Sequence, residues 1–295
     1  MNQSGWLAER FEDHRGHLRA VAFRMLGSLS EADDAVQESW LRLSCSDTDS
    51  VENLGGWLTT VVARVCLDML RSRKSRREDS LDLPISLVRT ELASRHNPEQ
   101  EAMMTDSVGL ALLIVLDALP PAERLAFVLH DIFAMPFDEI AAIVGRTPVA
   151  AKKLASRARH RVQGRDTVGR TDRVRQRKVV EAFLAASRSG DLSALIAVLD
   201  PAVVRRADPH ALPPGGAIEV HGAQSVATEA LTNTGLAQFA HIALVNGNVG
   251  LIVALPHQLR LALSLTIQND KIVEIDVIAD PARLRDTELG VLNLD

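Results

Sequence analysis

Apolar residues recur at intervals of three and four along the first 165 residues of the chain, with polar residues between them. This spacing places the apolar side chains on one face of a helix, so it predicts a series of amphipathic helices. A stretch with two prolines and weak periodicity, from Asp79 to Pro98, interrupts the series. The apolar residues with this spacing before that break are Leu18, Val21, Ala22 and Met25, then Ala35, Trp40 and Leu41, then Leu58, Val62, Val65, Cys66 and Met69, and the last set is the predicted buried face of its helix.

The pattern changes after the joint Gly164–Thr171. Helical spacing continues over Thr171–Arg188 and Leu192–Leu199, and short runs rich in Val, Ile and Leu then follow. The runs VVRRA, AHIALV, GLIVAL, LRLALSLTI and KIVEIDVI are separated by the turn-forming stretches PPGG, NGN, PHQ and QND. Alternation of apolar and polar residues in the last two runs is typical of half-buried antiparallel strands. The predicted fold is multidomain, with an all-α part followed by an α+β part.

Composition narrows the classes of function. The chain has 295 residues and a net charge of −5, so any contact with nucleic acid must come from local basic patches. Its two cysteines, Cys45 and Cys66, have no metal-ligand spacing, which predicts a reducing compartment and no metal. No apolar run approaches the about 18 residues of a membrane span, and the first residues lack an apolar leader. We therefore expect a cytoplasmic protein that needs no cofactor.

The segment TPVAAKKLASRARHRVQ, Thr147–Gln163, predicts a basic helix. Thr147 suits the N-cap and Pro148 the first helical position. The preceding FDEIAAIV, Phe137–Val144, predicts a short helix, and Gly145 a turn, which together indicate a helix-turn-helix. The predicted buried face is Ala151, Leu154, Ala155, Ala158 and Val162. The candidate DNA contacts are Arg146, Thr147, Val149, Lys152, Lys153, Ser156, Arg157 and Arg159, because the second helix of this motif enters the major groove. A basic helix that is merely solvated is the alternative.

Two helices of opposite charge are predicted nearer the start of the chain. Glu31–Leu43, EADDAVQESWLRL, is acidic, and Gly55–Glu78, GGWLTTVVARVCLDMLRSRKSRRE, is basic. A simple repressor needs only a helix-turn-helix. An acidic helix beside a basic one, followed by a linker and a helix-turn-helix, is therefore an unusual combination.

These segments resemble a known family. EADDAVQESWLRL and WLTTVVARVCLDMLRSR resemble region 2, and LPPAERLAFVLHDIFAMPFDEIAAIVGRTPVAAKKLASRAR resembles region 4, of extracytoplasmic-function (ECF) bacterial sigma factors. RQRKVVEAFLAASRSGDLSALIAVLDPAVV resembles a SnoaL-like α+β domain with a cone shape, which is fused to one branch of that family. The resemblance implies region 2 at 1–78, a linker at 79–106, region 4 at 107–165 and the SnoaL-like regulatory domain at 171–295.

The resemblance also implies partners and roles. The protein would bind core RNA polymerase, recognise and help melt promoter DNA, catalyse no reaction itself, and be regulated through intramolecular contact of its C-terminal domain with the sigma domains. The implied polymerase-binding residues are Asp33, Asp34, Gln37, Glu38 and Leu41. The implied minus-ten contacts are Asn53, Thr60, Arg64, Asp68 and Arg71, beside a base-capturing loop at Ser44–Leu54 lined by Ser46, Asp47, Thr48 and Asn53. The basic helix would then contact the minus-thirty-five element, and the region 4 core would include Leu125, Phe127, Val128 and Ile132.

Three positions depart from the family pattern. Val65 stands where Asn is usual, LDLPISL at Leu81–Leu87 keeps only Leu-Pro of the branch's linker signature, and ADPHALPPGGAIEVHG at Ala207–Gly222 replaces an Asp-Gly-Gly-Gly motif. The linker–domain docking of that branch does not transfer directly to this chain.

A cone-shaped domain usually encloses a pocket. The candidate pocket residues are Asp208, His210, His221, Asn233 and His241. A carboxylate and a histidine could perform acid–base chemistry there, but regulation is the favoured interpretation. His14 and His17 lack further ligands and are interpreted as surface residues. Two alternatives stay open: a ligand-responsive helix-turn-helix regulator that does not engage polymerase, and a SnoaL-like cyclase or isomerase with a DNA-binding arm.

Overall fold

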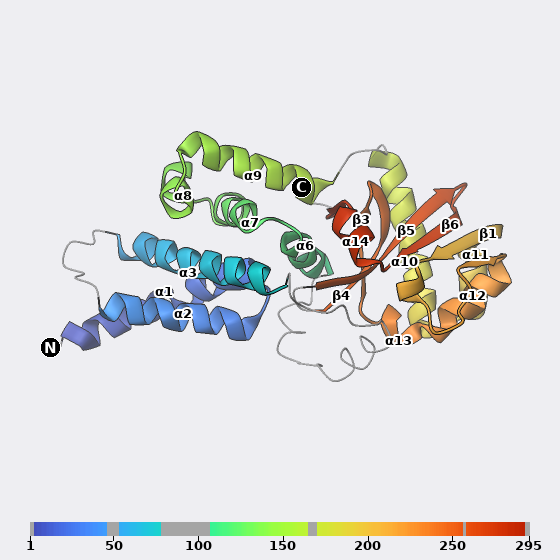
Figure 1. Cartoon of the computed structure of the whole chain (residues 1–295), viewed down its shortest axis with the longest axis horizontal. Coiled ribbons are helices and arrows are strands. Elements are labelled where there is room, and N and C mark those ends of the chain that lie inside the picture. Colours follow the sequence, from blue (N-terminus) through green and yellow to red (C-terminus); the bar gives the residue numbers. More distant parts are fainter. Residues whose placement is uncertain (1–2, 46–52, 78–106, 165–169, 256–257, 293–295) are drawn as a thin grey trace. The chain divides into compact units, whose positions relative to one another are not determined.

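The computed structural model describes residues 3–45, 53–77, 107–164, 170–255 and 258–292. The chain divides into two compact units (Figure 1). The first contains Met1–Ser80 and Leu119–His160, and the second contains Leu81–Ala118 and Arg161–Asp295. The predicted order, an all-α part followed by an α+β part, is confirmed.

Three helices form one half of the first unit: α1 (Gln3–Leu26), α2 (Leu29–Ser44) and α3 (Leu54–Arg77), which pack against one another. Ser28 is the N-cap of α2, and its hydroxyl accepts a hydrogen bond from the Glu31 N–H at 3.5 Å. The predicted apolar face of α1 is buried, since Leu18, Val21, Ala22 and Met25 have no exposed surface. Trp40 of α2 packs against Phe11 of α1, with ring centroids 5.1 Å apart.

The other half of the first unit holds α7 (Pro121–Phe127), a π-helical turn η1 (Val128–Ile132), α8 (Phe137–Val144) and α9 (Pro148–Gln163). Gly145 ends α8 in the left-handed conformation, with φ at +66°, which a residue with a Cβ adopts only at a cost. This turn makes α8 and α9 a helix-turn-helix, as the sequence predicts. Arg124 of α7 is almost fully buried, and its guanidinium donates to the carbonyl of Arg24 at 3.2 Å.

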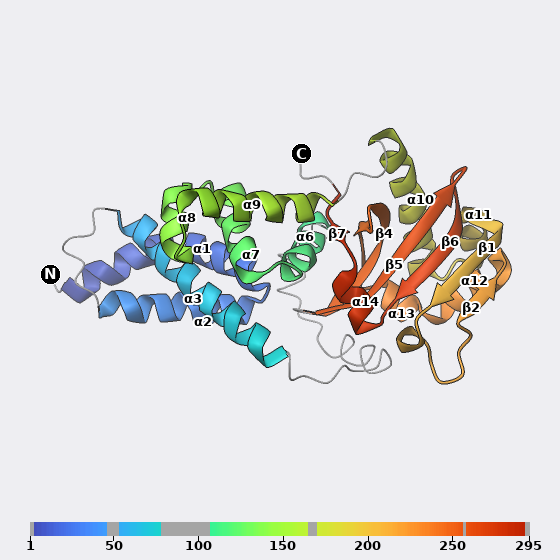
Figure 2. The ribbon, with the colours of Figure 1, turned by 45° about the horizontal axis from the view of Figure 1, so that its top comes forward.

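The second unit is built on one seven-stranded sheet with the order β2-β1-β6-β5-β4-β3-β7 (Figure 2). Strands β1 and β6 are parallel, and the other described pairs are antiparallel. Asn246 and Gly247 both have positive φ in the turn between β3 and β4, as a tight hairpin requires. The five predicted strands are confirmed, and β2 and β7 are additional. The strands are β1 (Leu199–Ala207), β2 (Glu219–His221), β3 (Ala240–Val245), β4 (Asn248–Leu255), β5 (Gln258–Gln268), β6 (Lys271–Ile278) and β7 (Leu289–Gly290).

Helices α10 (Arg170–Ser189), α11 (Leu192–Val198), α12 (Ala223–Thr232) and α13 (Thr234–Ala237) pack on one face of this sheet through a single hydrophobic core. Opposite residues of antiparallel strands share a face, so Ala240, Val253 and Leu261 point into this core. Their sequence neighbours His241, Ile252 and Ala262 point to the other face. A 3-10 turn η2 (Pro209–Ala211) and a short helix α14 (Pro281–Asp286) complete the unit.

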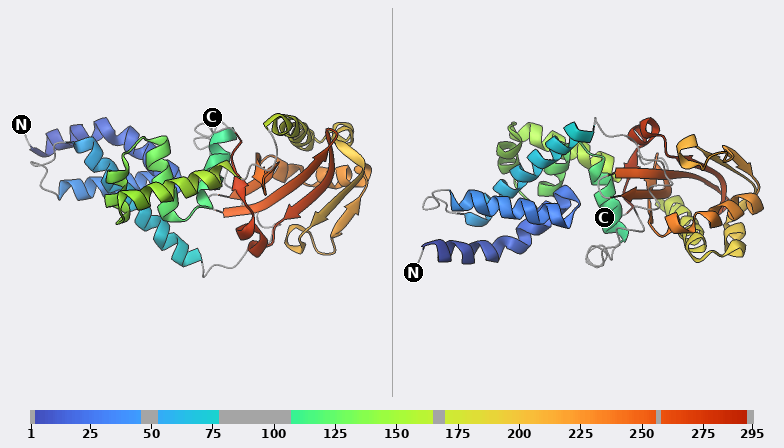
Figure 3. Two further views of the ribbon diagram at one scale, coloured as in Figure 1. Left: turned by 90° about the horizontal axis from the view of Figure 1, so that it is seen from above. Right: turned by 60° about the horizontal axis from the view of Figure 1, so that its bottom comes forward.

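Helix α6 (Ser107–Asp117) also belongs to the second unit, although the sequence groups it with the helices up to Gln163. It contacts β3, β5 and β7 (Figure 3). All six residues from Ala111 to Leu116 are buried, so this helix has no wide polar face to turn to water. The apolar surface of the sheet explains why α6 packs there.

Candidate polymerase and nucleic-acid interfaces

The residues implied to bind polymerase form an exposed stripe on α2. Ala32, Ala35, Val36, Ser39 and Leu43 turn inward, which leaves the remaining positions of the helix facing out. The stripe consists of Asp33, Asp34, Gln37 and Leu41, which are exposed, and Glu38, which is half-buried. Leu41 is 52% exposed, which is unusual for a large apolar side chain in the helical bundle.

Ion pairs on this stripe are at the surface and can exchange. Arg19 of α1 pairs with Asp33 at 2.7 Å, and Arg42 pairs with Glu38 at 2.9 Å. Exposed pairs of this kind contribute only about 0–1 kcal/mol, so a basic partner can replace them at little cost. Glu31, by contrast, pairs with Arg73 of α3 at a less exposed position. Glu31 therefore has a structural role between α2 and α3, whereas Asp34 and Glu38 face outward.

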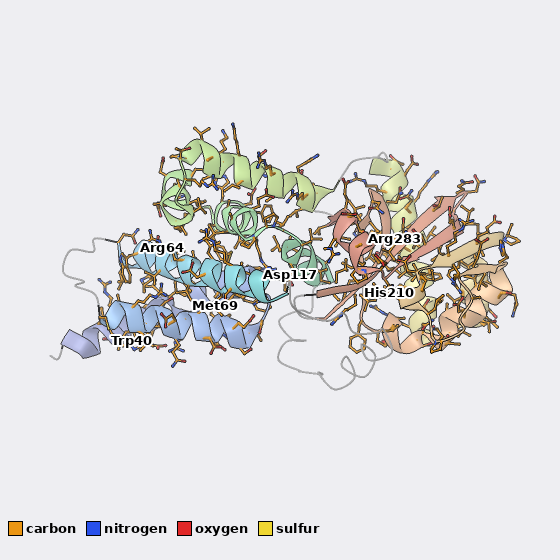
Figure 4. All side chains as sticks on the ribbon, viewed as in Figure 1. Trp40, Arg64, Met69, Asp117, His210 and Arg283 are labelled. Atoms are coloured by element: carbon orange, nitrogen blue, oxygen red, sulfur yellow. The ribbon has the colours of Figure 1, made fainter. Side chains whose placement is uncertain are left out.

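The implied minus-ten contacts lie on α3 at helical spacing. Thr60 is half-buried, while Arg64, Asp68 and Arg71 are exposed along the same side of the helix (Arg64 is labelled in Figure 4). Arg64 donates to the carbonyl of Ala142 in α8 at 3.3 Å, and Asp68 pairs with Arg71 at 3.7 Å. Both interactions are at the surface. The stripe is polar and carries two guanidinium groups.

Asn53 has a second role that the sequence did not reveal. Its side-chain oxygen accepts from the Gly56 N–H at 3.0 Å and so helps cap the start of α3. A Cβ at Gly56 would lie 2.8 Å from the Asn53 side-chain nitrogen, so this arrangement suits a glycine. Most of the implied base-capturing loop, including Ser46, Asp47 and Thr48, lies outside the described residues.

The basic helix α9 has the two faces that the sequence predicts. Ala151, Ala155, Ala158 and Val162 have no exposed surface, and Leu154 is half-buried. Thr147 caps the helix, since its hydroxyl accepts from the Ala150 N–H at 3.3 Å. The candidate DNA-contacting residues are exposed except for half-buried Arg159: Arg146, Thr147, Val149, Lys152, Lys153, Ser156 and Arg157.

The candidate DNA-contacting residues form the α9 stripe. Arg159 and Val149 differ from its other members. The Arg159 guanidinium donates to the Asp131 carboxylate of η1 at 2.8 Å, so its charge is already partly neutralised. Val149 is 67% exposed, and an apolar group at that position can contact a thymine methyl in the major groove. The stripe therefore offers two unlike kinds of DNA contact, cationic and apolar.

Most of the residues predicted to form the region 4 core are buried. Leu125, Phe127 and Val128 are buried. Ile132, at the end of η1, is 36% exposed. The edge of Phe133 packs against His17 of α1, with ring centroids 5.3 Å apart.

The candidate pocket residues of the second unit are spread over several places. The unit has a cavity of about 140 Å³, and of the five candidates Asn233 alone lines it. His210 and His221 are exposed beside Asp280 and Glu219, at 3.6 and 2.8 Å. Burial would raise the pKa of Asp208, but the N–H groups of Asp280 and Ala279 and the Arg283 guanidinium outweigh it, so the pKa is lowered.

His241 lies on the sheet face opposite the cavity. Burial, reinforced by the positive charge of Arg188, lowers the pKa of His241 to about 4. The imidazole is therefore neutral at neutral pH. The pocket candidates do not converge on one acid–base site, and within the described residues no cluster of three metal-ligating side chains occurs.

Sequence reasoning missed the buried charged residues. Arg124 and Arg205 have only 1% and 5% of their surface exposed, although arginine is seldom fully buried. Nothing in their local sequence distinguishes them from surface arginines. The cavity lining could have been predicted, because the alternation in β4 and β5 places Leu251, Val253 and Leu261 on one face. None of the described helices is both long and apolar enough to cross a bilayer.

Comparison with known proteins identifies the family. Residues 10–76 match the model of sigma-70 region 2, and residues 110–162 match that of sigma-70, region 4. The chain is 33% identical over 290 residues to the probable ECF RNA polymerase sigma factor SigI of Mycobacterium tuberculosis, covering 96% of this chain and 97% of SigI. It is 38% identical over 253 residues to the ECF RNA polymerase sigma factor SigJ of the same species, covering 83% of this chain and 80% of SigJ.

The similarity to SigI extends through the second unit, well beyond the two sigma regions. The crystal structure of SigJ superimposes with a TM-score of 0.46 at 29% identity, covering 94% of this chain and 98% of that one. A family of this kind performs no covalent chemistry of its own, so the cyclase or isomerase alternative is withdrawn. The chain belongs to the ECF sigma factors, non-enzymatic proteins that direct transcription initiation.

Proposed function

We propose that three surface stripes divide the work of initiation in this protein. The α2 stripe binds core RNA polymerase, the α3 stripe with the preceding loop contacts the minus-ten element, and the α9 stripe contacts the minus-thirty-five element. The observation that carries the proposal is the acidic, exposed α2 stripe with Leu41 at its end, in a chain whose α3 and α9 have basic exposed faces. A regulator that never engages polymerase has no use for the α2 stripe.

Run-off transcription with purified core polymerase tests this assignment. In the full chain, Asp34→Lys and Glu38→Lys together should abolish start-site-specific transcripts, because they reverse the charge offered to a basic partner. Asp13→Lys, at an exposed position of α1, is the matched control and should leave transcription near wild type. Normal transcription by the Asp34/Glu38 variant would contradict the α2 assignment.

We further propose that the C-terminal domain regulates the sigma domains through the end of α9. The last residues of α9, Arg161–Gln163, belong to the second unit. The Val291 N–H donates to the carbonyl of Val162 at 2.7 Å, just after β7. Gly164 and Gly290 also approach closely, since a Cβ on Gly290 would lie 2.9 Å from the Gly164 backbone. The helix that carries the DNA stripe thus ends within the C-terminal domain.

A single methyl group probes this junction in the full chain. Gly290→Ala forces the two backbones apart and should change promoter-specific transcription severalfold, in the direction that defines the domain as activator or inhibitor. Gly235→Ala is the matched control, because nothing lies within 4 Å of the Cβ it adds. Equal transcription by both variants and wild type would contradict regulation through this junction.

A form ending at Gln163 is a weaker test of regulation. It removes β3, β5 and β7, the strands that α6 contacts, and so exposes the apolar surface of that helix. Reduced activity of that form could result either from misfolding or from the loss of regulation, and the assay would not distinguish them. The point variants avoid this ambiguity.

A further inference from the structure

The cavity of the second unit lies between the sheet and the helices on its core face. Its volume is about 140 Å³. The apolar lining comes from α10, α12 and α13 on one side and from β4, β5 and β6 on the other. Representative lining residues are Phe183, Val226, Leu236, Leu251, Val253 and Leu261. Protein interiors are normally close-packed, with few voids larger than a water molecule, so a hollow of this size in the middle of a core is a distinct feature.

The charged groups in the cavity wall already satisfy one another. Arg205 is buried, and its Nε donates to the Glu229 carboxylate at 3.0 Å. Its Nη1 donates to the carbonyls of Ala217 and Ile218 at 2.9 and 3.3 Å, and its Nη2 pairs with both oxygens of Glu229. An anionic ligand would have to displace Glu229, and a cationic ligand would have to displace Arg205. Displacing Arg205 would leave its buried guanidinium unpaired, and displacing Glu229 would break a charge-assisted, bidentate pair; both are unfavourable.

The lining has two uncharged polar side chains, Ser187 and Asn233, and each already makes one hydrogen bond within the protein. The Ser187 hydroxyl donates to the Phe183 carbonyl at 2.8 Å, so toward a ligand it can act only as an acceptor. The Asn233 amide nitrogen donates to the Glu229 carbonyl at 3.3 Å. The other lining residues are apolar, apart from the Arg205–Glu229 pair, so the wall favours an occupant with few polar groups.

The mouth of the cavity is marked by lining residues that are partly or fully exposed. Ala211, Leu212, Ala230 and Ala237 are half-buried, and Asn233 is exposed. They come from the segment after β1 and from α12 and α13. These short elements form the mouth, whereas the strands form the floor.

We infer that this cavity binds a neutral, predominantly apolar small molecule of about the size of one substituted aromatic ring. An engineered apolar cavity of about 150 Å³ stays dry and binds benzene, which sets the scale for a cavity of this volume. The ligand contacts the floor strands and the inner faces of α10 and α12, and it carries no charge and few polar groups. The inference concerns the second unit alone and does not depend on the proposed roles of the three stripes.

Three probes that share one ring test the predicted selectivity in the full chain. 4-Fluorotoluene, 4-fluorobenzoate and 4-fluorobenzylammonium are titrated and followed by fluorine NMR, with toluene as competitor. We expect saturable binding of 4-fluorotoluene, displacement by toluene, and at least about tenfold weaker binding of both charged probes, since a buried unpaired charge is costly. Equal binding of a charged probe would overturn the neutral class, and no saturable binding of 4-fluorotoluene would overturn the site.

Two variants at the mouth test the location. Ala237→Phe and the milder Ala230→Leu fill part of the cavity and should weaken 4-fluorotoluene binding at least about tenfold, while thermal unfolding confirms that each variant is folded. Ala185→Phe, on the exposed side of α10, is the control and should bind as wild type does. Unchanged affinity in both mouth variants would overturn the assignment to this cavity. Because the assay contains no polymerase, its failure leaves the sigma assignment untouched.

Discussion

Helices α6 and α9 both overlap the residues that match sigma-70 region 4, yet they are built in opposite ways. Helix α9 has an inner face of alanines and an outer face of lysines and arginines. Helix α6 is apolar between Ser107 and Asp117, its residues Ala111–Leu116 are buried, and it contacts β3, β5 and β7 of the second unit. A helix with a free polar face can serve a partner outside the chain. A helix without a free polar face can only pack inside the protein. Helix α6 therefore stabilises the fold, whereas α9 keeps an exposed face for an outside partner.

The largest expected difference between the two helices concerns stability. Leu116→Ala in α6 should lower the free energy of unfolding by about 2–5 kcal/mol, because Leu116 has no exposed surface and its truncation leaves a cavity. Val149→Ala in α9 should change it by no more than about 0.5 kcal/mol, since that side chain is mostly exposed. Urea unfolding of both variants measures the difference. Equal destabilisation by the two substitutions would contradict the contrast.

A smaller effect on the free energy of unfolding is expected from the titration of His241 in β3, one of the strands that α6 contacts. The pKa of His241 is about 4 in the folded protein and about 6.5 when unfolded, so below pH 6.5 the unfolded chain binds the proton more readily. Stability should fall as the pH is lowered from 6.5 to 4, by at most about 3 kcal/mol. In His241→Leu the fall over this range should be smaller, and what remains includes His17, whose pKa is also lowered by burial. Urea unfolding at several pH values distinguishes the profiles, and identical slopes would contradict the assignment.

The same contrast explains what could be predicted from the sequence. Periodicity identified the inner face of α9, from Ala151 to Val162, because an amphipathic helix shows its packing in its own sequence. It could not assign α6 to a partner, since a helix that is apolar on all sides packs equally well against helices or a sheet. The pocket candidates were chosen for their chemistry, as with His210 and Asp208. The structure uses Asp208 to bind Arg283 and two backbone N–H groups, and only the tertiary fold reveals that role.

Within α9, the lysines and Arg159 should contribute unequally to promoter binding. Lys152 and Lys153 are exposed, and a lysine that binds a phosphate adds about one unit to the slope that describes the salt dependence of holoenzyme–promoter binding. Lys152→Ala and Lys153→Ala should therefore each lower that slope by about one unit and weaken binding most at low salt. A salt slope unchanged in both variants would show that neither lysine binds a phosphate.

The smallest expected effect distinguishes a free cation from a paired one. Arg159 is held by Asp131, so Asp131→Asn should release its guanidinium toward the DNA and also remove a nearby negative charge. Promoter binding by the holoenzyme should tighten a fewfold, and its salt slope should steepen by less than one unit. Asp138→Asn, on the adjacent helix α8, removes the same charge from an exposed position and is the control. If the two variants bind equally, net charge alone explains the gain. If the Asp131 variant binds more tightly, the ion pair in the structure restrains Arg159, and the DNA-binding strength of α9 is set in part by η1.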